Sequence, residues 1–171
     1  MILSKWELRK LGEACDVIMG QSPPGSSYNK RGDGVPFFQG KADFGKISPT
    51  VTTWCKSPKK IAEPNDVLIS VRAPVGPTNM SNIQCCIGRG LAAIRAKNRI
   101  NPKFIFYYLR NIEGKLSATG TGSTFTSISK SQVVNLEIPI APPNEQKLIV
   151  AEIEKQFSRL DEAVAALKRI K

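Results

Sequence analysis

The chain has 171 residues, 41% of them hydrophobic, a formal net charge of +11 and no histidine. This length fits one domain of about 100–200 residues, and the apolar fraction excludes a disordered chain. The missing histidine excludes Ser-His-Asp triads, Cys-His dyads and most catalytic zinc sites, which all need an imidazole. The apolar runs are too short for a membrane span and the charged start shows no signal peptide, so we expect a cytoplasmic protein without membrane contact.

The chain contains four cysteines, and their spacing does not indicate metal or redox chemistry. No Cys-x-x-Cys motif is present, and the adjacent Cys85 and Cys86 cannot form an unstrained disulfide with each other. We expect Cys15, Cys55 and both members of this pair to be buried or half-buried, reduced thiols.

Short strands and polar loops alternate through most of the chain. Strands are predicted at residues 14–20, 67–71, 83–87, 91–94 and 136–140, with shorter apolar or β-rich segments at 35–38 and 50–54. Residues 67–71 read as the clearest buried strand, and Pro139 indicates a strand at a sheet edge. The loops that separate the strands are rich in Gly, Pro, Ser and Asn and span residues 21–34, 39–46, 72–79, 88–90 and 120–130.

Two helices are predicted before the C-terminal region. The first begins at Asn101 and Pro102, since Asn caps helices and Pro suits the first turn, and we expect it to end at Gly114. Ser129 or Ser131 is expected to cap a second, shorter helical turn.

One long helix follows the Pro142–Pro143 pair, from residue 144 or 145 to about 170, and contains no Gly or Pro. At about 1.5 Å per residue it is roughly 40 Å long. Its apolar residues follow heptad steps of 3, 4, 3, 4 and 3: Val150, Ile153, Phe157, Leu160, Val164 and Leu167. Such a narrow stripe favours an intermolecular coiled-coil arm. The alternative is an amphipathic helix that lies on its own domain.

The positive charge is concentrated outside this helix. Residues 1–143 carry 19 basic and 9 acidic side chains, whereas residues 144–171 carry 6 and 5. Between Val67 and Leu136 the only acidic residue is Glu113. A basic body of this kind attracts polyanions, of which nucleic acid is the most common in cytoplasm.

The candidate contacts with nucleic acid lie in the Gly- and Pro-rich loops. Arg, Lys and Gln side chains can contact base edges and phosphates, and Ser and Thr suit phosphates. On residue type and loop position we select Gln21, Gln39, Lys41, Lys46, Arg72, Arg89, Ser123, Thr124 and Lys130.

No catalytic motif is convincing. The chain lacks the Asn/Asp-Pro-Pro-aromatic tetrapeptide of amino-directed methyltransferases, a P-loop and a dinucleotide fingerprint. A metal-dependent nuclease would have to combine Glu113 and Lys115, at a helix end, with the distant Asp66. We therefore expect no catalytic residue, no metal site and no bound cofactor.

The order of several motifs resembles one repeat of the specificity (S) subunit of type I restriction-modification enzymes, over nearly the whole chain. The most specific piece is the strand, Pro-rich turn and Glu-Gln helix start between Leu136 and Val150. The motifs are Trp6-x-x-x-x-Leu11-Gly12, Gly20-Gln21-Ser22-Pro23, Asp66-Val67-Leu68-Ile69-Ser70, Thr121-Gly122-Ser123-Thr124, Leu136-x-Ile138-Pro139-Ile140 and Pro142-Pro143-Asn144-Glu145-Gln146-Lys147-x-Ile149-Val150.

The resemblance implies an α/β (α+β) target-recognition domain with a mixed or antiparallel sheet at residues 1–143. Residues 144–171 would form a long helix that pairs antiparallel with a partner helix and spaces two recognition domains. Such subunits usually hold two recognition domains and two helices, whereas this chain has one of each, so it is either a fragment or a half-subunit. Asn65 also stands where a Gly commonly precedes the Asp.

The implied function is that of a non-catalytic, sequence-specific DNA reader of one half-site of a two-part target. It would pair with a second copy or another half-subunit and dock modification (methyltransferase) subunits, which carry S-adenosylmethionine, and through them the restriction subunit. The alternative is a standalone dimeric DNA- or RNA-binding protein unrelated to restriction. Co-purification with a methyltransferase subunit separates the two.

Overall fold

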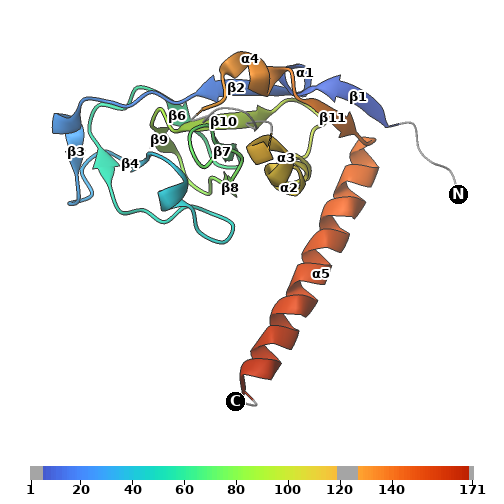
Figure 1. Ribbon diagram of the computed structural model, residues 1–171. Coiled ribbons are helices and arrows are strands. Elements are labelled where there is room, and N and C mark those ends of the chain that lie inside the picture. Colours follow the sequence, from blue (N-terminus) through green and yellow to red (C-terminus); the bar gives the residue numbers. More distant parts are fainter. Residues whose placement is uncertain (1–5, 119–126, 170–171) are drawn as a thin grey trace, which may run out of the picture.

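In the computed structural model, which describes residues 6–118 and 127–169, helix α5 projects from a body built of short strands (Figure 1). The strands are β1 (Glu7–Lys10), β2 (Cys15–Met19), β3 (Tyr28–Asn29), β4 (Val35–Phe38), β5 (Trp54–Cys55), β6 (Ile61–Ala62), β7 (Val67–Ser70), β8 (Thr78–Met80), β9 (Cys85–Ile87), β10 (Leu91–Ala96) and β11 (Glu137–Ile140). The α-helices are α1 (Leu11–Ala14), α2 (Pro102–Asn111), α3 (Glu113–Ala118), α4 (Lys130–Val134) and α5 (Pro143–Arg169), and the 3-10 turns are η1 (Gly25–Ser27) and η2 (Lys41–Asp43).

The described strands form three sheets. One has four antiparallel strands in the order β2-β10-β7-β8, and β1 pairs antiparallel with β11 in a second. The third has the order β3-β5-β4-β9-β6 and is mixed, because β4 and β9 run parallel. The predicted fold class, mixed and antiparallel sheets followed by a long C-terminal helix, is confirmed.

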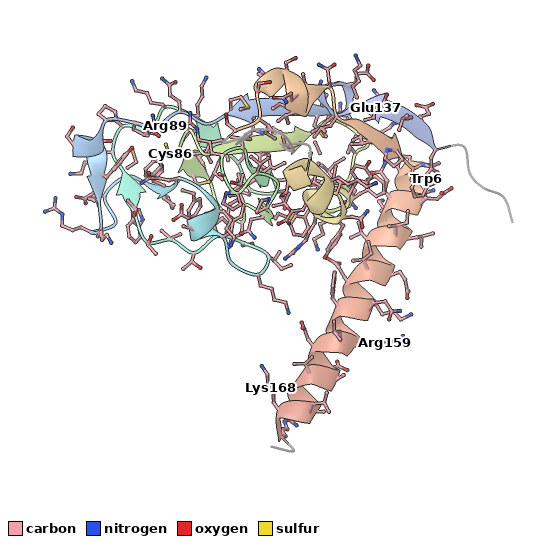
Figure 2. All side chains as sticks on the ribbon, viewed as in Figure 1. Trp6, Cys86, Arg89, Glu137, Arg159 and Lys168 are labelled. Carbon is pink, nitrogen blue, oxygen red and sulfur yellow. The ribbon has the colours of Figure 1, made fainter. Side chains whose placement is uncertain are left out.

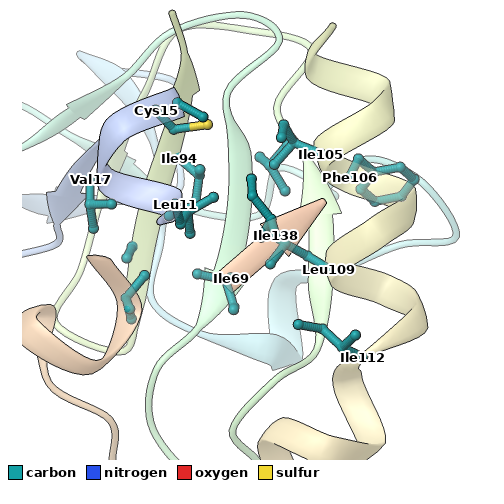
Figure 3. Packing of buried hydrophobic residues seen from close by; sticks show 14 of the residues in the cluster. Leu11, Cys15, Val17, Ile69, Ile94, Ile105, Phe106, Leu109, Ile112 and Ile138 are labelled. Atoms are coloured by element: carbon teal, nitrogen blue, oxygen red, sulfur yellow. The ribbon is translucent and has the colours of Figure 1, made fainter. Parts of the chain in front are cut away.

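Strand β7 lies at the centre of the core because both of its faces are covered. All four of its residues are buried, and successive side chains of a strand point to opposite faces. Ile69 packs with α2 and β10 in the larger cluster, where Figure 3 shows it near Ile94 and Leu109, whereas Leu68 belongs to a second cluster with Phe38. A strand buried on both faces reads as a nearly continuous apolar run, and Ser70 is the one polar residue in 67–71, which is why this segment was the clearest strand in the sequence.

Tertiary packing changes two of the predicted elements. Helix α2 is capped as expected, since the Asn101 side chain accepts the Lys103 N–H, but Gly114 does not end it. The helix breaks at Ile112 and continues as α3, and burial of Ile112 and Leu116 in the core stabilises this second turn. In the predicted β-rich segment 50–54 only Trp54 pairs in a strand. Ser129 caps α4 as predicted.

The turn before β7 explains the Asn65-Asp66 pair. Asn65 has φ of 74°, a conformation that Gly and Asn tolerate best. Asp66 is 2% exposed, accepts two hydrogen bonds from Arg95 at 3.0 and 2.7 Å, and accepts the Glu63 N–H. Its carboxylate is therefore engaged in holding the turn, which argues against the nuclease alternative.

The four cysteines are free and buried, as predicted. Burial raises the pKa of the Cys15 thiol to about 12 and that of Cys85 to about 11. Among the described residues, no helix combines the length and the apolar character that crossing a membrane requires.

The Cys15 thiol should make stability depend on pH in alkaline solution. An unfolded thiol loses its proton near pH 9, whereas the folded one keeps it up to about pH 12. Its stabilising contribution is thus complete below pH 9 and is lost as the pH rises toward 12. We expect the free energy of unfolding, from urea titrations between about pH 7 and 11, to fall more steeply above pH 9 than in Cys15→Ala, by up to about 1.4 kcal/mol per pH unit. Equal slopes would contradict this assignment.

Candidate functional site

Four of the residues selected from the sequence lie around one surface cavity of about 270 Å³, although they come from three separate loops. The cavity is lined by Ser22, Gln39, Gly40, Lys41, Ser70, Arg72, Ala73, Arg89 and Gly90. Figure 2 labels Arg89, one of the lining residues, which lies on the body far from Arg159 and Lys168 of α5. The tertiary structure therefore brings Gln39, Lys41, Arg72 and Arg89 together.

The loop that carries Gln39 and Lys41 is organised by one carboxylate. Asp43 accepts the backbone N–H groups of Gln39 at 2.7 Å and Gly40 at 3.3 Å, and so closes the turn η2. The side chains of Gln39 and Lys41 consequently remain exposed at the rim of the cavity.

The loop that carries Arg89 lies directly against this turn, and only glycine permits the approach. A Cβ on Gly90 would lie 2.3 Å from the carbonyl oxygen of Gln39, well inside any normal contact. Arg89 stands at the tip of the turn, where Leu91 N–H bonds to Gly88 O, and its own N–H donates to Ser22 Oγ at 3.3 Å.

Arg72 lines the cavity and lies just after the end of β7 in the chain. The Ser70 hydroxyl donates to the carbonyl oxygen of Arg72 at 3.0 Å, which orders the chain as it leaves the strand. Arg72 also forms an isolated antiparallel bridge with Ser127. The described end of the 120–130 loop thus lies beside the cavity. Ser123 and Thr124 lie outside the described residues.

The basic side chains at this cavity differ in their surroundings from several others on the body. Lys41, Arg72 and Arg89 are exposed, and within the part of the chain that the structure describes none of them forms an ion pair with a carboxylate. By contrast, Arg95 is bonded to Asp66, and these bonds raise its pKa. Cations without a carboxylate partner retain their full attraction for an external anion.

The other selected residues lie elsewhere. Lys46 forms an ion pair with Asp161 of α5 at 2.6 Å. Lys130 is the first residue of α4, which packs with α1 and β2, on the opposite side of the body from the η2 turn in Figure 1. Gln21 bonds through its backbone to Ile87 and does not line the cavity. Sequence reasoning missed Ser22, although it lies in a selected loop.

The apolar stripe of α5 divides into two parts. Val150 is 5% exposed and belongs to the core of the chain's own body, so its expected place in an intermolecular seam is corrected. Ile153 is half-buried, and Phe157 packs on Tyr107 of α2 with ring centroids 6.1 Å apart. Leu160, Val164 and Leu167 are 56%, 40% and 67% exposed. The helix therefore lies on its own domain at its base and is open to solvent beyond it.

A buried glutamine attaches α5 to the body, a role that sequence reasoning missed. Gln146 is fully buried; its Oε1 accepts the Asn101 N–H at 2.7 Å, and its Nε2 donates to the carbonyl oxygens of Ala141 at 2.7 Å and Arg99 at 3.5 Å. Next to it, Glu145 accepts a hydrogen bond from Trp6. The only signal in the sequence was the Glu-Gln pair after the two prolines.

Comparisons with known proteins agree with one another. The family model for the type I restriction modification DNA specificity domain matches residues 3–170. A curated relative from Methanocaldococcus jannaschii, the putative type I restriction enzyme MjaX specificity subunit, is 43% identical, covering 97% of this chain and 39% of the relative.

Two solved structures likewise match nearly the whole of this chain with part of their own length. The HsdS subunit from Thermoanaerobacter tengcongensis is 51% identical with a TM-score of 0.81, covering 96% of this chain and 39% of that one. The type I restriction-modification system S subunit from M. genitalium is 18% identical with a TM-score of 0.71, over 96% of this chain and 42% of that one, and shows likeness of fold. The chain spans about two fifths of the length of these relatives.

Proposed function

Because the chain belongs to the family of type I restriction-modification DNA specificity domains, we propose that it binds double-stranded DNA and reads one half of a two-part target. The observation that carries this proposal is the convergence of Gln39, Lys41, Arg72 and Arg89 on one cavity. The cations Lys41, Arg72 and Arg89 have no carboxylate partner among the described residues. The conformations of their loops are held by Asp43, Gly90 and Ser70.

The side chains at the cavity match the chemistry of duplex DNA. Arg forms paired hydrogen bonds to the O6 and N7 atoms of guanine, and Gln forms paired hydrogen bonds to the N6 and N7 atoms of adenine. Lys41 suits a phosphate, because its charge is compact and its stem flexible. We assign base reading to Arg72, Arg89 and Gln39 and phosphate contact to Lys41. Ser123, Thr124, Gln21 and Lys130 remain predicted contacts with DNA.

In this proposal the chain is non-catalytic and needs no cofactor of its own. Methyl transfer and S-adenosylmethionine belong to methyltransferase subunits that dock on the chain, and cleavage belongs to a restriction subunit that joins through them. The family membership supports this division of tasks. The body at residues 1–143 would be the reading domain, and the helix from residue 144 would be the spacer between two such domains.

We also propose that the exposed part of α5 pairs antiparallel with the helix of a second copy. Leu160, Val164 and Leu167 form an apolar stripe that the described body does not cover. A two-fold dimer of readers predicts a palindromic target whose half-sites lie about one helical turn, roughly 34–36 Å, apart.

The function is tested by selection from a pool of random duplexes of about 30 base pairs, roughly three helical turns, with the purified chain. We expect enrichment of two short half-sites, inverted with respect to each other and separated by a fixed gap. Enrichment of one continuous site, or preference for single-stranded RNA, would instead favour the standalone binding protein. Affinity purification from the source cells should recover a methyltransferase subunit.

The close approach at Gly90 provides a test that leaves every charge in place. Gly90→Ala should push the Arg89 turn away from Gln39, since its Cβ would lie 2.3 Å from a backbone oxygen. We expect about tenfold weaker binding of the selected duplex, equivalent to roughly 1.4 kcal/mol, in fluorescence anisotropy titrations. The matched control is Gly25→Ala, where the new Cβ would meet nothing within 4 Å. Equal affinities of the two variants would count against the assignment of this cavity.

A further inference from the structure

The segment at residues 20–28 connects β2 to β3 and lies against the Arg89 turn (residues 88–91). The N–H groups of Gly20 and Gln21 donate to β10 at 2.8 Å and to β9 at 3.0 Å, the two strands that this turn joins. One residue later, the hydroxyl oxygen of Ser22 accepts the Arg89 N–H at 3.3 Å. The position of the segment therefore affects the position of the Arg89 backbone.

The far end of this segment is held by the Tyr28 hydroxyl. It donates to the carbonyl oxygen of Pro23 at 2.8 Å, across five positions of the chain. Burial raises the pKa of Tyr28, and a hydrogen bond from the Ser22 hydroxyl and the charge of Arg89 partly oppose this rise. A chain of hydrogen bonds thus runs from the Arg89 N–H through the hydroxyls of Ser22 and Tyr28 to Pro23.

The Tyr28 ring is anchored in the core. It packs on Phe37 of β4 with ring centroids 4.6 Å apart, and Phe37 is 1% exposed. The other neighbour of Phe37 is the start of the Arg89 turn, since a Cβ on Gly88 would lie 3.3 Å from the Phe37 ring. A buried strand residue therefore fixes the ring, and the hydroxyl has a defined place from which to hold the segment.

We propose that Tyr28 is a positioning residue for DNA reading, which holds the Arg89 turn through the Ser22 hydroxyl and the Pro23 carbonyl oxygen. Ser22 lines the cavity and Tyr28 does not, so Tyr28 acts through these groups rather than by contact with DNA. The inference rests on the proposed function and gives the segment at residues 20–28 a part in it.

Loss of the Tyr28 hydroxyl is expected to affect base reading more than charge attraction. Paired hydrogen bonds from an arginine to guanine require a defined placement of the guanidinium, whereas attraction of a basic body for phosphates requires only charge. Tyr28→Phe removes one hydroxyl, keeps the ring that packs on Phe37 and leaves every charge in place. The variant should therefore lose discrimination between duplexes and keep its general attraction for DNA.

Fluorescence anisotropy with the selected duplex and with a scrambled duplex of equal length measures this difference. We expect Tyr28→Phe to bind the selected duplex about fivefold more weakly, as the loss of one hydrogen bond predicts, and the scrambled duplex with unchanged affinity. The matched control is Tyr108→Phe on α2, because the Tyr108 hydroxyl also donates to a carbonyl oxygen, that of Glu137 at 3.2 Å, and does not line the cavity. This control should leave both affinities unchanged.

The possible failures of this experiment have different meanings. If Tyr28→Phe keeps the wild-type preference, Tyr28 does not position the turn and the proposal is wrong. Equal weakening on both duplexes, together with a lower urea midpoint than that of Tyr108→Phe, would show a general disturbance of the fold and would also overturn it. A wild-type chain that binds all duplexes alike would contradict the proposed function itself, and the role of Tyr28 would fall with it.

The route through Ser22 is tested by combining Tyr28→Phe with Ser22→Ala. Both changes break the same chain of hydrogen bonds, so the double variant should bind the selected duplex about as weakly as the weaker single variant. The matched control is Ser26→Ala, an exposed serine of the same segment that does not line the cavity, which should leave the affinity unchanged. If the losses from Tyr28→Phe and Ser22→Ala multiply, the two side chains act independently and the proposed route is refuted.

Discussion

Replacing Arg72 and Arg89 together by alanine is expected to weaken binding of the selected duplex by about 100-fold or more. Each arginine that forms paired hydrogen bonds to a base contributes about 1–3 kcal/mol of discrimination. Both side chains are exposed, they line the same cavity, and no described carboxylate pairs with either. The measurement is fluorescence anisotropy with the selected duplex and with a scrambled duplex of equal length.

The dependence on salt separates base reading from simple charge attraction. If the two arginines read bases, their loss should affect the selected duplex far more than the scrambled one. If they contact only phosphates, both duplexes should weaken alike and the slope of log affinity against log salt should fall by about two. The control is Lys155→Ala with Arg159→Ala, which removes the same charge from exposed positions of α5. Equal loss of affinity in the control would contradict the assigned site.

The second large effect is expected at the base of α5, where Gln146→Leu should lower the free energy of unfolding by about 2–4 kcal/mol. The leucine fills a similar volume but leaves the part-buried Asn101 N–H and the buried Ala141 carbonyl oxygen without these hydrogen bonds. An unsatisfied buried polar group costs about 1–3 kcal/mol. Urea denaturation followed by circular dichroism measures the change.

The matched control for this variant is Gln156→Leu on the same helix. Gln156 is exposed, and among the described residues its side chain bonds only to Glu152, so we expect a change within about 0.5 kcal/mol. A loss at Gln146 no larger than at Gln156 would show that the buried hydrogen bonds do not hold the helix. Because Gln146 and Val150 belong to the body, removal of residues 144–171 should also destabilise residues 1–143.

Much of the fold was predictable because it depends on local chemistry and periodicity. The apolar run Val67–Ile69 of β7 favours burial on both faces, and Asn101 and Ser129 have side chains that cap helices. Helix α5 has no residue that would interrupt it before Arg169. The limits of α2 were not predictable, because Gly114 is tolerated inside α3 once Ile112 and Leu116 are buried beside it. Burial against distant segments outweighs a propensity difference of about 1 kcal/mol.

The candidate site, too, was predictable only in part. Residue type and loop position selected Gln39, Lys41, Arg72 and Arg89 from the sequence, but nothing in the sequence joined their three loops. The same criteria selected Lys46, which the structure pairs with Asp161, a residue 115 positions further along the chain. A lysine in a polar loop looks the same in the sequence whether or not a carboxylate lies beside it in space.

The sequence by itself determined the class of protein, the strand and helix content, the absence of imidazole chemistry and the concentration of basic residues outside α5. These properties depend on composition and on short-range periodicity, which need no folded structure. Only the tertiary structure decided which cations share one cavity, which part of the α5 stripe is buried in its own body, and that Gln146 anchors the helix. These properties depend on contacts between residues far apart in the chain, and the packing of the three sheets and α2 creates those contacts.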